Sequence, residues 1–218
     1  SAAIHQGIKT IEAKRGRGGL AVCVEKMFAA EPHESPANLL NAAFLKEESD
    51  VEGGFAGVFG RIADLYFQKY GDKRDALAHI AAKNHKNGMD NPLAQLRKDL
   101  GYEFCRTESE KSPIVAGPLK RTDCSLVSDG AAALVLADLE TALTLDKAIA
   151  FRSSVQVNDY LPMSRRDIID FTGPTEAWRQ AFGKAKVGVN DLSFAEVHDC
   201  FTIAEMLIYE AMGLTEKG

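Results

Sequence analysis

Three polar residues that could take part in catalysis, His198, Asp199 and Cys200, stand in a row. They follow the run DLSFAEV and precede TIAEMLIYEAMG, which has the apolar spacing of a helix. Open α/β folds bind ligands where a strand's carboxyl end meets a helix's amino end, because unpaired N–H groups and the positive helix dipole converge there. A neutral histidine at that place can donate an N–H to an oxygen that gains negative charge. His198 is therefore a candidate catalytic residue.

A plainer interpretation of these residues stays open. Histidine and aspartate beside a helix start are common as caps, and a lone cysteine is more often a small buried residue than a nucleophile. A cysteine and a histidine two positions apart on an extended segment share a face, but their reactive atoms hardly meet well enough to form a dyad.

The elements that must position these residues begin at the start of the chain. Residues 1–15 carry isoleucines at helical spacing, and the glycine-rich turn at 16–19 ends that pattern. Residues 20–24, LAVCV, form a short apolar run that is typical of a strand buried on both faces of a parallel sheet. Together they predict one α/β unit at the start of the chain.

A change of character marks residues 31–118, which are rich in charges and contain no comparable apolar run. Residues 58–71 and 75–88 look like two helices, each closed by a glycine. We therefore expect a mostly helical insertion. The small and β-branched residues of 128–138 then predict a tightly packed strand, and 148–157 is a further strand candidate.

The last third predicts a helix over 172–187 that begins near Pro174, then a strand through DLSFAEVH, then a final helix. In that final helix Thr202 and Glu205 fit the T-x-x-E pattern of a capping box. Gly213 follows the last turn as a stop signal.

Composition sets wider limits on function. The chain has 218 residues, of which 45% are apolar and 26% charged, with a net charge of −5. That charge argues against a dedicated nucleic-acid or anionic-membrane surface, and no apolar run approaches the roughly 20 residues of a membrane span. The four cysteines show neither a zinc pattern nor a disulfide framework, which favours a reducing compartment. We expect a soluble protein without a metal site.

Several segments resemble the thiolase superfamily, whose members include acetyl-CoA acetyltransferases. EVHDCFTIAEMLIYEAMGL resembles the segment in which thiolases of the sterol carrier protein x type carry H-D-C-F where other thiolases carry N-E-A-F. CSLVSDGAAALVLA (124–137) resembles the C-S-x-x-S-D-G-A-A-A segment of the same superfamily. KNHKNGMDNPLAQ (83–95) and AGPLKRTDCS (116–125) resemble its loop domain, and LAVCVEKM (20–27) one of its strands. The matches keep their expected order over nearly the whole chain.

This resemblance implies a thiolase fold, incomplete in this chain: two similar α/β halves with five-stranded sheets in layered α-β-α-β-α packing, and an inserted, mostly helical loop domain. Its domain boundaries would place 1–30 in the N-terminal half, 31–118 in the loop domain over the coenzyme A site, 119–145 back in the N-terminal half and 146–218 in the C-terminal half.

The implied activity is thiolytic cleavage of a 3-oxoacyl-CoA, or the reverse Claisen condensation, in lipid metabolism, through an acyl-cysteine intermediate. Coenzyme A and acyl-CoA would be substrates, with no covalently bound cofactor. A homodimer or homotetramer is implied, with no nucleic-acid or membrane partner. The compartment would be the cytoplasm in a bacterium, or the peroxisome or mitochondrial matrix in a eukaryote.

Carried over by position, His198 matches the N-E-A-F asparagine, which holds a water that helps to form an oxyanion hole. Asp199 would orient the loop, and Phe201 would pack beneath it. By a weaker alignment Ser153 falls where a serine meets the pantetheine arm, although an isolated serine in a strand is more often simply packed or solvated.

Met163 and the Gly-Pro pair at 173–174 resemble the M-G-x-G-P segment that closes over the site. Nine residues separate Met163 from Gly173, where the family usually has few, so the wall of the acyl pocket is left undefined. Basic residues of the insertion could meet the coenzyme's 3′-phosphate or simply form a solvated face; they are Lys83, Lys86, Arg97, Lys98, Lys120 and Arg121.

The family's nucleophilic cysteine would immediately precede Ser1, and its G-H-P histidine and C-x-G cysteine would follow Gly218. None of Cys23, Cys105, Cys124 and Cys200 occupies a matching position. We therefore expect a fragment lacking both ends that is inactive by itself.

Two alternatives remain for the chain's function. One is a non-catalytic acyl-CoA binding protein of the same fold. The other, a nucleotide-binding domain built on RGRGG, is disfavoured because these glycines follow a helix and precede a strand, the reverse of a phosphate-binding loop.

Overall fold

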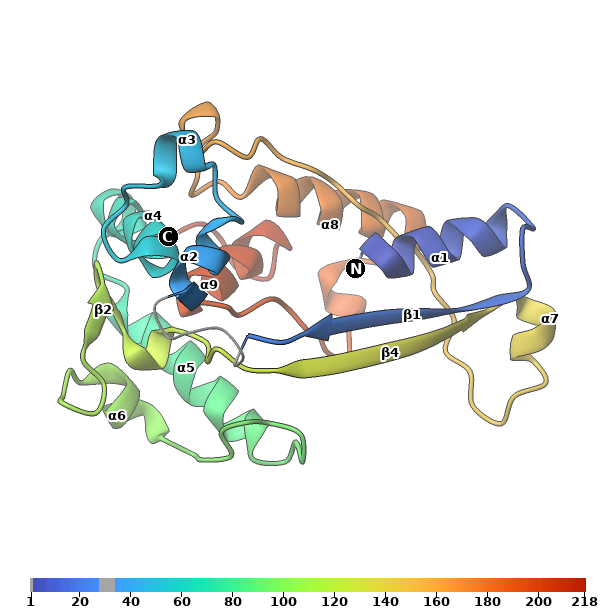
Figure 1. Cartoon of the computed structure of the whole chain (residues 1–218), viewed down its shortest axis with the longest axis horizontal. Coiled ribbons are helices and arrows are strands. Elements are labelled where there is room, and N and C mark those ends of the chain that lie inside the picture. The colour runs from blue at the N-terminus through green and yellow to red at the C-terminus, as the bar shows by residue number, and fades with distance from the viewer. Residues whose placement is uncertain (1, 28–33) are drawn as a thin grey trace.

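A long two-stranded ribbon runs out from a cluster of helices in the computed structural model, which describes residues 2–27 and 34–218 (Figure 1). Strands β1 (Gly18–Glu25) and β4 (Gly130–Ala137) pair antiparallel, with Gly18 opposite Ala137 and Glu25 opposite Gly130. Helix α1 (Ala2–Glu12) lies along this ribbon. A side chain at Gly7 would meet Leu136 at 2.5 Å, so the glycine permits the close approach of helix and strand.

Both predicted strands of this ribbon are present, but the predicted environment of β1 is wrong. Leu20 is 65% exposed and Val24 69% exposed, whereas we expected a strand buried on both faces of a parallel sheet. Within the described residues each sheet has two strands, fewer than the five that the resemblance implied. A short apolar run indicates that a strand can be buried, but it carries no information on which strands pair with it.

The region predicted as an insertion is mostly helical. It contains α2 (Glu34–Leu40), α3 (Leu45–Glu48), α4 (Gly54–Tyr70), α5 (Arg74–Gly88) and α6 (Gly101–Arg106). A short hairpin of β2 (Ile114–Ala116) and β3 (Leu119–Lys120) follows them, and the turn η1 (Arg121–Asp123) comes next. The two predicted helices correspond to α4 and α5. The predicted first residue of the insertion, Glu31, lies outside the described residues.

Two helices of the last third confirm their predictions. After α7 (Leu139–Ala142) and the turn η2 (Met163–Arg165), α8 spans Thr172–Ala185, and α9 (Thr202–Ala211) follows the turn η3 (Val189–Asp191). Gly213 ends α9 as predicted. It has a φ of 76°, its N–H bonds to the Glu210 carbonyl at 3.1 Å, and the Leu214 N–H bonds to the Tyr209 carbonyl at 2.9 Å.

Two strand predictions are wrong. Residues 148–157 and the run DLSFAEVH at 191–198 form no strand. Most of each segment is irregular chain. An alternating or apolar run can satisfy a strand pattern without having a neighbouring strand to bond with, and pairing is what defines a strand.

The predicted capping box at the start of α9 is also wrong. The Thr202 hydroxyl donates to Asp123 Oδ1 at 2.9 Å, and the Glu205 carboxylate binds side chains of α5. Both groups are therefore held by tertiary partners instead of by the helix's own N–H groups.

The hydrophobic core lies between α4, α5 and α9. Ile62 and Tyr66 of α4, Leu77 of α5, and Ile203 and Leu207 of α9 are all buried in it. Because the first turn of α9 is buried in this core, the end of the segment that precedes the helix is held in place. None of the helices in the described part of the chain combines the length and apolar character that crossing a bilayer requires.

Truncating Leu207 tests whether this core carries the fold. Leu207→Ala should lower the free energy of unfolding by about 2 to 5 kcal/mol, since it leaves a cavity among fully buried neighbours. Ile149→Ala, at a residue that is 83% exposed, is the matched control and should cost far less. Urea denaturation measures both, and equal losses in the two variants would contradict the placement of the core.

Candidate functional site

The residues predicted to do chemistry lie where an irregular segment enters α9. A bridge pairs Phe201 with Cys124, and the Ser125 N–H donates to the Cys200 carbonyl at 3.0 Å. The segments 124–129 and 198–201, which resembled family motifs separately, therefore meet side by side, paired antiparallel at Cys124 and Phe201. His198 is exposed, as is Asp199, and Cys200 is half-buried.

A buried carboxylate ties these two segments together. Asp123 is 1% exposed and accepts from the Thr202 hydroxyl at 2.9 Å, the Lys120 N–H at 2.8 Å and Lys120 Nζ at 3.0 Å. Its charge also lies beside the amino end of α9, where the helix dipole favours an anion. Asp123 thus fixes the start of α9 against the turn that follows β3.

Phe201 is the apolar anchor of the segment. It is buried, stacks on Phe59 with ring centroids 4.3 Å apart, and lies 6.0 Å from Phe55 in a tilted arrangement. The expectation that Phe201 would pack inward is confirmed. Since both phenylalanine partners belong to α4, the core of the helical cluster holds the residue three positions after His198.

Asp199 is anchored by polar contacts. Asn84 Nδ2 donates to Asp199 Oδ2 at 3.0 Å and to Glu205 Oε2 at 2.6 Å. Lys83 Nζ and the Tyr209 hydroxyl bind the other Glu205 oxygen. Sequence reasoning missed Asn84 and Glu205 as parts of this site. Asn84 lies in the segment 83–95, whose resemblance to the loop domain could have indicated it. Glu205 was instead interpreted as part of a capping box.

His198 consequently lies at the surface directly before two fixed residues. Asp199 is bonded to α5, and Phe201 is buried against α4. The imidazole of an exposed histidine at this place can offer a ring N–H to an oxygen that gains charge. Whether it does so in catalysis remains a prediction.

Ser153 and Met163 lie in other parts of the chain. Ser153 is half-buried, and its neighbour Ser154 shares a 2.8 Å hydrogen bond with His5 Nδ1 of α1. Met163 is buried in the same core as Phe201. Its backbone N–H donates to the buried Glu48 carboxylate at 2.9 Å. The roles of Ser153 and Met163 in binding coenzyme A remain predictions.

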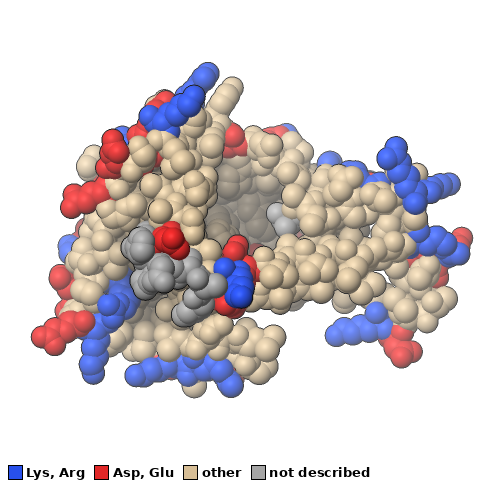
Figure 2. Space-filling model, in the orientation of Figure 1, with Lys and Arg blue, Asp and Glu red and all other residues tan. Residues whose placement is uncertain are grey.

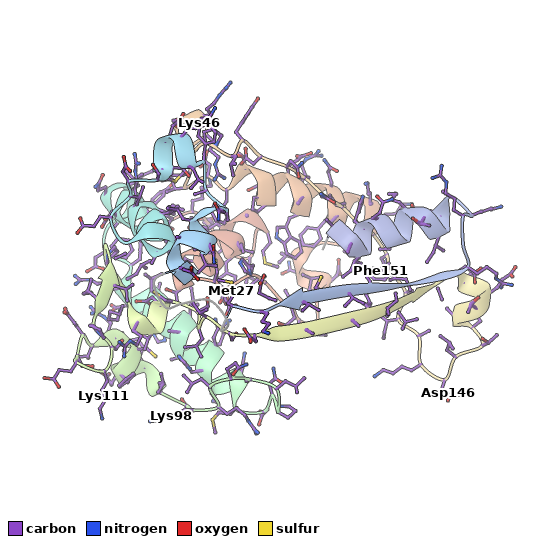
Figure 3. All side chains as sticks on the ribbon, viewed as in Figure 1. Met27, Lys46, Lys98, Lys111, Asp146 and Phe151 are labelled. Carbon is purple, nitrogen blue, oxygen red and sulfur yellow. The ribbon has the colours of Figure 1, made fainter. Side chains whose placement is uncertain are left out.

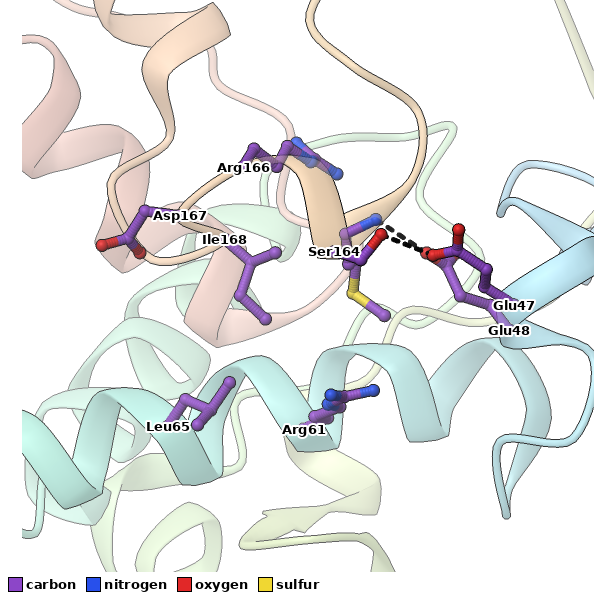
Figure 4. A pocket seen from close by; sticks show the side chains of 9 residues that line it. Glu47, Glu48, Arg61, Leu65, Ser164, Arg166, Asp167 and Ile168 are labelled. Atoms are coloured by element: carbon purple, nitrogen blue, oxygen red, sulfur yellow. Dashed lines mark hydrogen bonds between the residues drawn. The ribbon is translucent and has the colours of Figure 1, made fainter.

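Met163 also lines a cavity of about 260 Å³ between α3, α4 and the turn η2 (Figure 4). Glu47 accepts from the Ser164 hydroxyl at 2.6 Å at its edge, and Arg61 and Leu65 of α4 form the opposite wall. His198 does not line this cavity. Met163 thus lies beside this small cavity as well as in the core that contains Phe201.

None of the four cysteines forms a disulfide, and three have thiols of raised pKa. Burial raises the pKa of Cys124 to about 12 and that of Cys200 to about 11, and it also raises the pKa of Cys105. A thiol with a pKa near 11 is ionised in roughly one molecule in ten thousand at neutral pH. Cys200 is therefore a poor nucleophile despite its place beside His198.

Two of the basic candidates for a coenzyme phosphate form internal ion pairs, and a third, Arg97, donates to the Met89 carbonyl at 3.2 and 2.9 Å. Lys120 is buried and paired with Asp123, so neither a solvated face nor an accessible phosphate site describes it. Lys83 is paired with Glu205. Among the described residues no group of three or more His, Cys, Asp or Glu is arranged to hold a metal ion.

The surface carries a second feature near this region. Met27 lies at the end of β1 that reaches the helical cluster, and its N–H donates to Asp129 Oδ1 at 2.7 Å (Figure 3). Uncharged residues cover most of the ribbon seen in Figure 2, and the face is hollowed above it, between the helical cluster and α1. The segment 124–129 therefore connects the pairing of Cys124 with Phe201 to the end of the β1–β4 ribbon that lies nearest the helical cluster.

Comparison with family models gives two matches. Residues 1–140 match the model described as thiolase, N-terminal domain, and residues 155–218 match the model described as thiolase C-terminal domain-like. Acetyl-CoA acetyltransferase of Methanothermobacter thermautotrophicus is 33% identical over 220 residues, covering 99% of this chain and 55% of that protein. Sterol carrier protein 2 of Oryctolagus cuniculus is 34% identical over 169 residues, covering 74% of this chain and 30% of that protein. The chain spans about half, or less, of the length of these relatives.

Solved structures share the fold at low identity. The Ltp2-ChsH2(DUF35) aldolase has a TM-score of 0.79 at 18% identity, covering 97% of this chain and 56% of that chain. A monomeric SCP2-thiolase like protein from Mycobacterium smegmatis has a TM-score of 0.77 at 17% identity, with 96% and 46% covered. The dimeric peroxisomal thiolase of Saccharomyces cerevisiae has a TM-score of 0.62 at 17% identity, with 97% and 58% covered.

Thiol labelling tests the assignment of the cysteines. At pH 7.5 a disulfide reagent should label the exposed Cys23 of the native chain quickly, whereas Cys105, Cys124 and Cys200 should react at least about 100-fold more slowly because burial keeps them protonated. Peptide mass spectrometry identifies the labelled sites, and labelling in urea is the control for full reactivity. Rapid native labelling of Cys200 would contradict its raised pKa.

Removing the Asp123 carboxylate tests the link between the two segments. Asp123→Ala should lower the free energy of unfolding by about 3 to 5 kcal/mol, because it leaves the buried Lys120 ammonium without its partner. The exposed Asp146, labelled in Figure 3, provides a control in Asp146→Ala, which should change stability by less than about 0.5 kcal/mol. Denaturant unfolding measures both variants, and a loss for Asp123→Ala as small as that of the control would rule out the proposed link.

Proposed function

Because the chain belongs to the thiolase family and has its α/β fold, we propose that His198 donates a hydrogen bond to an oxyanion in a thiolase-type acyltransferase. The family and the fold class predicted from the sequence are thereby confirmed. The observation that carries the proposal is the exposure of His198 directly before two fixed residues, the hydrogen-bonded Asp199 and the buried Phe201. A donor held in place before the reaction needs no reorganisation when charge develops.

The reaction we propose is thiolysis of a 3-oxoacyl-CoA, or Claisen condensation in reverse. A thiolate attacks the 3-oxo carbon, and the carbonyl oxygen becomes an oxyanion. The bond between the α and β carbons then breaks as the oxyanion reforms a carbonyl, and the thioester carbonyl accepts the electron pair as an enolate, which takes up a proton and leaves as an acyl-CoA. The thiol of coenzyme A finally gives up a proton, attacks the acyl-enzyme and frees the enzyme's thiolate. Each step places negative charge on an oxygen, which is where an N–H donor lowers the barrier.

His198 would act on one of these oxygens directly or through a held water. The H-D-C-F segment, which resembles the N-E-A-F segment of other thiolases, supports the second arrangement. We do not propose Cys124 or Cys200 as the attacking thiolate, because burial raises both pKa values to about 11 or 12. In this proposal the attacking thiolate is none of the chain's four cysteines.

Substrate binding is proposed for other parts of the chain. Ser153 would meet the pantetheine arm, and Met163 would border the acyl group. Residues 31–118 would form the loop domain over the coenzyme, and the domain boundaries at 30, 118 and 145 remain part of this proposal. The mostly helical content of that region supports it.

Assembly and setting are likewise proposals. A homodimer or homotetramer is proposed from the family resemblance, and the similar solved structures include one monomeric and one dimeric protein. We propose a role in lipid metabolism, which the sterol carrier protein relative supports. The proposed compartment is the cytoplasm in a bacterium, or the peroxisome or mitochondrial matrix in a eukaryote.

A second candidate is a non-catalytic acyl-CoA binding protein of the same fold. The raised pKa values of three of the four thiols favour it for this chain considered alone. Because an aldolase also shares the fold, the fold by itself does not decide the reaction.

Substitution of His198 tests the proposal. The 218-residue chain should bind acetoacetyl-CoA, measured by calorimetry, but should not accelerate its thiolysis. In a longer polypeptide that contains the chain and catalyses thiolysis, His198→Ala should lower kcat by roughly 10²- to 10³-fold, because one oxyanion donor is lost. His198→Asn should lose much less, since an amide can also donate. His79→Ala, at an exposed histidine stacked on Tyr102, is the control and should leave kcat unchanged.

Three results separate the candidates. Binding without thiolysis in every longer polypeptide favours the non-catalytic protein. Thiolysis that survives His198→Ala overturns the role of His198. Failure of the chain to bind any acyl-CoA overturns both candidates for this part of the protein.

A further inference from the structure

One side-chain amide holds two carboxylates next to each other at the start of α9. Asn84 Nδ2 on α5 donates at 3.0 Å to Asp199 Oδ2 and at 2.6 Å to Glu205 Oε2. An amide nitrogen carries two hydrogens, so this nitrogen satisfies both acceptors at once. Asp199 precedes the helix and Glu205 lies at the end of its first turn. Asn84 therefore fastens the segment before α9 and the helix itself to the same point of α5.

The charges around Asn84 make its two N–H groups important. Glu205 is 1% exposed, and its other oxygen binds Lys83 Nζ and the Tyr209 hydroxyl. Lys83 Nζ also donates to Tyr209 at 2.9 Å. The cluster thus contains two carboxylates and one ammonium, and that ammonium is bonded to Glu205. Without a donor between them, two carboxylates this close repel one another.

We propose that Asn84 is a positioning residue, which acts through Asp199 to fix the peptide that presents His198. Asp199 is exposed, so packing does not hold its side chain, whereas the hydrogen bond from Asn84 does. With Phe201 buried against α4, the chain is then fastened at two points directly after His198, one on each side of Cys200. The catalytic meaning of this role rests on the proposed function, but the geometric role does not.

The position of Asn84 gives the proposal a wider consequence. Asn84 belongs to α5, within the region proposed to cover the coenzyme. The helix layer on the substrate side would therefore also order the segment that binds the oxyanion. A change in α5 would reach His198 through one amide, without touching the ring itself.

A purely structural fastening of α5 to α9 makes a different prediction. It would stabilise all of α9 equally, including Leu207 in the buried core. A positioning role would affect the Ser125 N–H, which donates to the Cys200 carbonyl at 3.0 Å, more than the Leu207 N–H. Native-state hydrogen exchange of backbone amides, read by NMR, measures both in one experiment.

The test uses the 218-residue chain and needs no catalytic activity. Asn84→Leu removes both donors at nearly constant volume and adds no charge. Asn87→Leu changes an exposed asparagine of the same helix and is the matched control. In Asn84→Leu the amide of Ser125 should exchange at least about 10-fold faster relative to Leu207, and the His198 ring signals should shift or broaden. Asn87→Leu should change neither.

A second variant keeps the test decisive if Asn84→Leu folds poorly. Asp199→Ala removes the acceptor at an exposed position and should produce the same change in the His198 ring signals. The effects of the two substitutions should not add in the double variant, because they break the same hydrogen bond.

Each outcome decides the inference. Equal acceleration of Ser125 and Leu207, or unchanged His198 signals in Asn84→Leu and Asp199→Ala, overturns the positioning role. A His198 response in a chain that fails to bind acyl-CoA supports the positioning role while the proposed function fails.

Discussion

The arrangement around His198 depends on the buried carboxylate of Asp123. It accepts hydrogen bonds from Thr202 on α9 and from the backbone and side chain of Lys120 after β3. A buried ion pair is a weak source of stability, because the cost of removing both charges from water offsets most of their attraction. Its three bonds have fixed geometry, however, so it specifies how the turn and the helix meet. The segment bearing His198 starts from that junction.

The first two turns of α9 combine two kinds of anchor. Ile203 and Leu207 pack into the apolar core, while Thr202 and Glu205 are buried with polar partners. Burying these polar groups is tolerable because Asp123, Asn84 and Lys83 satisfy them. The apolar contacts supply most of the free energy, and the polar contacts determine the rotation of the helix about its axis. A candidate catalytic loop requires both, since a loop on a helix free to rotate would not keep its donors aimed.

Sequence patterns predicted the helices of this structure better than its strands. The periodicity of α4, α5, α8 and α9 is a local property, and a helix makes its own backbone hydrogen bonds. The failed strands at 148–157 and 191–198 needed a neighbour that no local pattern identifies. The capping box failed for a related reason: Thr202 and Glu205 have the right types and spacing, but partners 79 and 121 or more residues away bind their side chains. His198 and Asp199 could be predicted as candidates because their place before a helix can be recognised from the local sequence. Predicting Asn84 would have required knowing which helix packs against that segment.

The packing that orders His198 also determines what this region can do chemically. Cys124 and Cys200 lie on the two paired segments, 124–129 and 198–201. The burial that anchors those segments raises the pKa of both thiols. The same interactions therefore fix the residues that follow His198 and keep the nearest thiols protonated. A thiolase reaction needs a donor and a thiolate at different atoms of one substrate, and a second reactive thiolate beside the donor would compete for the same carbonyl. In the proposed reaction, keeping Cys200 protonated would leave the His198 ring as the group that meets the substrate oxygen.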